Sequence, residues 1–66
     1  MTATLTPVRF TAQSAGRIHA RASVHAAEYR EMARIAQDED TRHALARIAE
    51  SHERIAARAA KALERF

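Results

Sequence analysis

Two stretches of the chain, separated by a short acidic segment, carry mostly apolar residues at alternating spacings of four and three. This spacing places the residues on one face of an α-helix, which has about 3.6 residues per turn. The first stripe comprises Ile18, Ala22, His25, Tyr29, Met32 and Ala36. The second stripe comprises Leu45, Ile48, His52, Ile55, Ala59, Ala62 and Phe66. The sequence therefore predicts an all-α chain built from two long amphipathic helices.

The start of the first helix is marked by polar residues that suit a helix N-cap. Residues 1–10 are rich in threonine and show no helical period, so we expect them to form a flexible N-terminal arm. Thr11 and Ser14 then provide a start signal, although Thr6-Pro7 is a possible earlier one. We place the first helix at about residues 12–37.

The acidic segment at residues 38–40 interrupts the apolar pattern and predicts a turn. Asp38 or Asp40 can cap a following helix, and carboxylates favour its positive N-terminal end. The second helix is predicted at about residues 40–65, which makes residues 11–66 an antiparallel two-helix hairpin. Because no Gly or Pro occurs in the acidic segment, one continuous helix in a coiled-coil dimer is the alternative.

The apolar content of the chain is dominated by alanine. Hydrophobic residues make up 47% of the 66 residues, but 17 of these 31 are alanines. A chain this short buries little surface, and without cysteine it has no disulfide to compensate. We therefore expect a homodimer that completes a four-helix bundle. The predicted interface residues are Ile18, Ala22, Tyr29, Met32, Leu45, Ile48, Ile55 and Leu63.

Composition argues against most enzymatic and membrane functions. The absence of cysteine excludes a thiol nucleophile and a zinc ribbon, and a single glycine excludes a glycine-rich phosphate loop. No serine has the context of a nucleophile. No apolar run is long enough to span a bilayer, and the first ten residues do not resemble a secretory signal. We expect a cytoplasmic, non-enzymatic protein that needs no cofactor and has no membrane partner.

Histidines are the residues with the clearest potential for chemistry. If the chain folds back at residues 38–40, His25 comes level with His52 and Glu53, and Glu28 lies one turn away. Imidazoles and carboxylates at one height could bind zinc or non-haem iron. The Glu-x-x-His spacing of ferritin-like di-iron bundles is absent, however. We therefore prefer packing roles for both histidines and keep a metal site as the alternative.

The basic residues raise a second alternative, nucleic-acid binding. Arg and Lys number 11 against 8 Asp and Glu, and the stretch containing Arg9, Arg17 and Arg21 has no acid. Elsewhere, however, the arginines are interleaved with carboxylates, and the polar faces lack aromatic residues for base stacking. A net charge of +3 with mixed signs is typical of a solvated surface. The sequence disfavours a nucleic-acid partner.

The segment 25–63 resembles a type of short, uncharacterised bacterial helical protein. Its pattern is roughly A-x-x-Y-R-x-x-A, an acidic turn, and R-x-x-L-x-x-I-A-E-x-Y-E-R-L-A. The matching residues are Ala26, Tyr29, Arg30, Ala33, Asp38, Arg42, Leu45, Ile48, Ala49, Glu50, Glu53, Arg54 and Ala56. His52 stands where the pattern has an aromatic residue. The resemblance implies a helical hairpin and no particular activity, so we expect an interaction module, such as a small adaptor or assembly factor, that binds itself or another helical protein.

Overall fold

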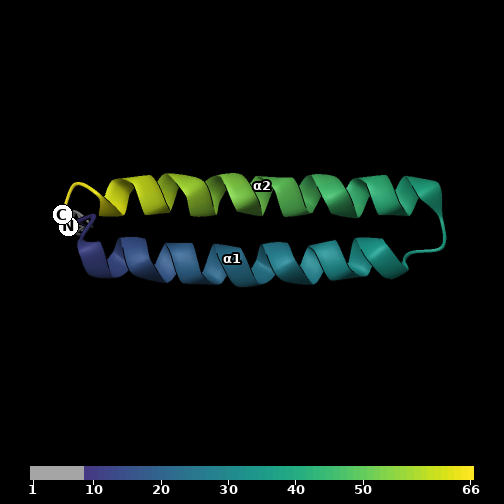
Figure 1. Cartoon of the computed structure of the whole chain (residues 1–66), viewed down its shortest axis with the longest axis horizontal. Helices are drawn as coiled ribbons and strands as arrows, with labels where there is room; N and C mark the ends of the chain where they lie inside the picture. Colours follow the sequence, from purple (N-terminus) through teal and green to yellow (C-terminus); the bar gives the residue numbers. More distant parts are fainter. Residues whose placement is uncertain (1–8) are drawn as a thin grey trace, which may run out of the picture.

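The computed structural model describes residues 9–66, which form two antiparallel α-helices joined by a short turn (Figure 1). Helix α1 spans Ala12–Ile35 and helix α2 spans Glu39–Leu63. The predicted hairpin is confirmed, and the alternative of one continuous helix is wrong. The first eight residues of the predicted arm, with the possible helix start at Thr6-Pro7, lie outside the described residues.

Helix α1 begins where the sequence predicts, at a reciprocal capping box. The backbone N–H of Thr11 donates to the Ser14 hydroxyl at 2.8 Å, and the backbone N–H of Ser14 donates to the Thr11 hydroxyl at 3.1 Å. These two bonds satisfy donors that a helix start otherwise leaves unpaired. Residues 11 to 14 therefore fix the first turn without any charged side chain.

The turn is earlier than predicted, because α1 ends at Ile35 rather than at residue 37. Ala36 is already extended, with φ −65° and ψ 134°, and its carbonyl accepts from the Arg42 guanidinium at 2.8 Å. Asp38 caps α2: its carboxylate accepts from the Thr41 backbone N–H at 2.9 Å and from the Thr41 hydroxyl at 2.7 Å. Because the cap is Asp38 and not Asp40, the chain must leave α1 by Ala36.

Helix α2 also ends two residues before its predicted limit. Leu63 is its last residue, and the next backbone N–H groups bond to carbonyls three residues back, Glu64 to Lys61 at 3.2 Å and Arg65 to Ala62 at 3.1 Å. Such bonds tighten the last turn of a helix into a 3₁₀-type geometry. The turn brings Phe66 near the start of α1, where its ring lies 6.3 Å from that of Phe10. Phe10, which is 50% exposed, therefore lies beside the C-terminal residue at this end of the hairpin.

The contact between the helices is lined by alanine. The buried residues are Ala15, Ala22, Ala26, Ala33, Ala49 and Ala59. Among residues 9–66 no larger side chain is completely buried. We call this line of alanines the seam. Small side chains let the two helices approach closely, but they remove little apolar surface from water, so the seam alone makes a thin core.

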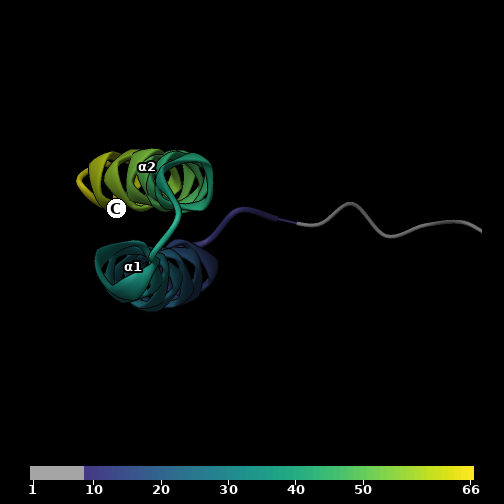
Figure 2. The ribbon, with the colours of Figure 1, turned by 90° about the vertical axis from the view of Figure 1, so that its right-hand side faces the viewer.

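The hairpin is a single layer two helices wide. Viewed along its length, it has no further element over either side of the helix pair within the described part of the chain (Figure 2). Neither helix of residues 9–66 is long and apolar enough to cross a membrane. Both broad faces of the helix pair are therefore open, and their side chains decide what the protein can contact.

Candidate interaction face

Large apolar side chains flank the seam on one side of the hairpin. On α1, Ile18 and Met32 lie seven residues before and after His25, and on α2, Ile48 lies seven residues before Ile55. Seven residues are about two helical turns, so each set projects from one side of its helix. We call the surface formed by Ile18, His25, Tyr29, Met32, Ile48, His52 and Ile55 the apolar face.

The aliphatic residues of the apolar face are only half covered. Ile18, Met32, Ile48 and Ile55 keep 39–46% of their surface exposed. The other predicted interface residues lie deeper: Ala22 is buried in the seam, and Tyr29, Leu45 and Leu63 have intermediate exposure. The hairpin thus covers the six alanines of the seam and leaves the four aliphatic side chains of the apolar face in contact with water.

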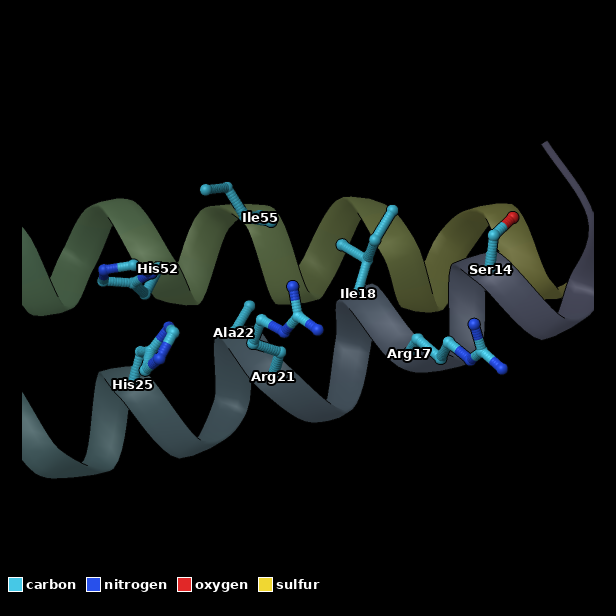
Figure 3. A pocket seen from close by; sticks show the side chains of 8 residues that line it. All are labelled: Ser14, Arg17, Ile18, Arg21, Ala22, His25, His52 and Ile55. Atoms are coloured by element: carbon cyan, nitrogen blue, oxygen red, sulfur yellow. The ribbon is translucent and has the colours of Figure 1, made fainter. Parts of the chain in front are cut away.

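The apolar face is hollowed along the end of the hairpin nearest Phe10. A groove of about 440 Å³ runs between the helices (Figure 3). It is lined by Ser14, Arg17, Ile18, Arg21, Ala22, His25, His52 and Ile55. A second hollow of about 380 Å³ shares Ile18 and Ile55 and extends to Phe10. The two hollows adjoin at Ile18 and Ile55, so this end of the face is concave and largely apolar, with Arg17 and Arg21 lining the larger hollow.

Three rings meet at the middle of the apolar face. The His25 and His52 rings lie edge to face with centroids 5.1 Å apart, and Tyr29 stacks on His52 at 5.5 Å with an interplanar angle of 8°. The sequence correctly predicts that the two histidines come level, since antiparallel helices joined at residues 36–38 pair these positions. Figure 3 shows both imidazoles directed to the same space between α1 and α2.

The carboxylates proposed for a metal site do not join this histidine pair. Both carboxylate oxygens of Glu53 accept from Arg30, at 2.7 and 3.0 Å. Glu28 is exposed, two turns after Arg21 on the outer edge of α1. In the part of the chain that the structure describes, no group of three or more His, Asp or Glu side chains could hold a metal ion. The metal site therefore stays a prediction, with its two imidazoles together and its carboxylates elsewhere.

The Arg30–Glu53 pair connects the two helices. The Arg30 guanidinium beside Glu53 lowers the pKa of that carboxyl, mainly through their hydrogen bonds, and the pKa of Arg30 is raised for the same reason. About half of each side chain is exposed, so water screens much of this attraction. The pair fixes the relative orientation of the helices more than it stabilises the fold.

The pairing of Glu53 with Arg30 was not predicted, because its place was predicted only from its position along the length of the hairpin. Antiparallel pairing predicts which residues come level, whereas the side of the seam depends on the angle around each helix. Glu53 follows buried Ala49 by four residues, and Arg30 follows buried Ala26 by four. That common offset from the alanine seam, with the opposite charges, is the signal that could have paired them.

Comparisons with known proteins identify no relative. No protein-family model matches the chain, and no curated protein or solved structure matches it either. The resemblance to short bacterial helical proteins therefore stays a prediction, and the function has to be argued from the apolar face itself.

Proposed function

We propose that this protein is a non-enzymatic interaction module, a small adaptor or assembly factor, that dimerises through the apolar face. Two hairpins packed face to face form a four-helix bundle, in which helices from both copies surround one core. Another helical protein with a matching face could take the place of the second copy. The dimer is the arrangement that the described side chains favour.

One observation carries this proposal: the buried residues are all alanines, while Ile18, Met32, Ile48 and Ile55 are nearly half exposed on one face. Covering a Leu, Ile or Met side chain completely stabilises a protein by about 1.5–3 kcal/mol. A second copy would finish the burial of Ile18, Met32, Ile48 and Ile55 and would add the same four side chains of its own. Contiguous apolar surface of this kind is typical of interaction sites.

The Tyr29, His25 and His52 rings suit the middle of such an interface. Each has an apolar body with a polar edge, so it can pack against a partner and still bond to water or to a polar group at the rim. Aromatic residues are enriched at the energetically important centres of interfaces. The rings of the apolar face stand where the two hairpins would meet most closely.

The experiment compares two substitutions of similar exposure on different sides of the hairpin. Ile55→Asn removes apolar surface from the apolar face. Val24→Asn is the matched control, because Val24 is 55% exposed but lies two residues from both Ala22 and Ala26, about 200° around α1 from the seam. Sedimentation equilibrium over a range of concentrations measures the dissociation constant of each protein.

We expect the wild type and Val24→Asn to form dimers of similar affinity. Ile55→Asn should raise the dissociation constant at least about tenfold, or about 1.4 kcal/mol, because each dimer contains the substitution twice. Circular dichroism at high concentration checks that the helices persist. A wild type that stays monomeric at all concentrations, or equal weakening by both substitutions, would contradict the proposal.

A further inference from the structure

The side-chain charges of the hairpin differ between its two ends. The half where Phe10 meets Phe66, residues 9–27 and 52–66, contains seven Arg or Lys and two Glu, a net charge of +5 with histidines neutral. The half with the turn, residues 28–51, contains four Arg and six Asp or Glu, a net charge of −2. The hairpin is therefore basic at one end and acidic at the other.

The basic end keeps two arginines beside the apolar face without an acidic partner. Arg17 and Arg21 line the groove, and neither takes part in an ion pair among residues 9–66. Glu28 likewise takes part in none of these pairs, and it lies two turns after Arg21 on the same edge of α1. The α1 edge of the apolar face therefore has a positive charge at Arg21, before His25, and a negative charge at Glu28, after His25.

Two hairpins that pack face to face can be related by a two-fold axis in two ways. An axis parallel to the helices puts both turns at the same end, so that each half meets the half of like charge. An axis across the helices puts the turns at opposite ends, so that the +5 half of each copy lies over the −2 half of the other. Arranging opposite charges across an interface selects one docking geometry over another.

We propose that the dimer has its two turns at opposite ends; this inference rests on the proposed function. The apolar residues fit the same axis. Ile18 and Met32 are equally far from His25 along α1. A two-fold axis at His25 therefore places Ile18 over the partner's Met32, and Met32 over the partner's Ile18. Ile48 and Ile55 lie four residues before and three after His52, which is level with His25. One axis therefore matches aliphatic residues on both helices.

The same axis pairs the free charges at the edge of the face. Arg21 lies four residues before His25 and Glu28 lies three after it. In the proposed dimer, Arg21 of each copy lies opposite the Glu28 position of the other. A two-fold interface repeats every contact, so one register supplies two ion pairs.

The topology can be measured with spin labels, because the chain has no cysteine of its own. In the proposed dimer, Gln37→Cys labels at the two turns lie at opposite ends, roughly 36 Å apart along the bundle at 1.5 Å per helical residue from His25. With turns at the same end they would lie within about 25 Å. Ser23→Cys is the control: it lies near the middle of α1, so its labels stay within about 30 Å in either topology.

Pulsed dipolar spectroscopy and sedimentation on the same samples separate the possible failures. A dimer with the long Gln37 distance and the short Ser23 distance supports the inference. A dimer in which both distances are short overturns the topology and leaves the proposed function intact. A monomeric mass without dipolar coupling overturns the proposed function and this inference with it.

A charge exchange tests the register independently. Arg21→Glu or Glu28→Arg alone places like charges opposite each other twice per dimer, and each should raise the dissociation constant several-fold at low salt. The double variant Arg21→Glu/Glu28→Arg restores opposite charges and should return the constant to within about twofold of wild type. A double variant as weak as the single ones would overturn this register.

Discussion

At the scale of single residues, Gly16 occupies a position at which the fold does not require glycine. Gly16 lies in the second turn of α1 and does not adopt a positive φ. Apart from the adjoining residues and the neighbouring backbone of its own helix, an added Cβ would meet no heavy atom within 4 Å. Glycine within a helix costs about 1 kcal/mol relative to alanine, because it loses more backbone freedom on folding.

Gly16→Ala should therefore stabilise the protein by about 1 kcal/mol, which raises Tm by about 4–8 °C for a chain of this size. Thermal unfolding followed by circular dichroism, at one fixed protein concentration, measures the change. Ala20→Gly is the matched control, since Ala20 is an exposed position in the same helix and should lower Tm by a similar amount. A lower Tm for Gly16→Ala would show that the position is constrained in a way that the free space around it does not reveal.

At the scale of the helices, starts are easier to predict from the sequence than ends. Thr11 with Ser14, and Asp38 with Thr41, are bonds between residues three apart, so the local sequence contains both partners. The end of α1 depends on Arg42, six residues away in the next helix, whose guanidinium binds the Ala36 carbonyl. A pattern of apolar spacings carries no information about such a bond, which is why the predicted helix ran two residues too far.

The Asp38 cap should make the stability of α2 sensitive to acid. Hydrogen bonds from the Thr41 hydroxyl and backbone N–H lower the pKa of Asp38 below its ordinary value of 3.8. A carboxyl with a lowered pKa in the folded state stabilises the protein above that ordinary value, and this contribution is lost as the pH falls through the lowered pKa. Asp38→Asn keeps an acceptor at the cap but removes the charge.

Urea unfolding at several pH values tests this dependence. The wild type should unfold at a higher urea concentration than Asp38→Asn at pH 5, and the difference should disappear towards pH 2. Glu31 and Glu53, whose pKa values are lowered by Arg34 and Arg30, weaken both proteins alike in acid, so the difference isolates Asp38. A difference that is constant over the whole range would show that the charge of Asp38 is not what stabilises the cap.

At the scale of the whole molecule, the sequence predicts the hairpin and the level at which its histidines meet. Both follow from helical spacing and antiparallel pairing, which depend only on residue numbers. The division of the surface into faces depends on which residues become the seam. The predicted stripes include Ala22 and Ala59, which are buried in the seam, but they also include Ile18 and Met32, which stay 40% and 46% exposed. Close packing of alanines displaces the larger side chains to one side, and that displacement creates the apolar face.

The position of the histidine pair places it at the centre of the proposed dimer interface. His25 and His52 are 5.1 Å apart, Tyr29 stacks on His52, and both imidazoles line the groove of the apolar face. A partner that covers these rings would remove their apolar surface from water, and aromatic side chains at the centre of an interface commonly contribute much of the binding free energy.

Truncating both rings should therefore weaken the dimer: His25→Ala/His52→Ala should raise the dissociation constant at least about tenfold. Sedimentation equilibrium measures the constant, and circular dichroism at high concentration checks that the helices persist. His43→Ala is the control, since His43 is highly exposed near the turn, beside Glu39, and should leave the constant unchanged. A double variant with the wild-type constant would mean that the histidine pair is not covered in the dimer, and the two hairpins would then have to meet away from it.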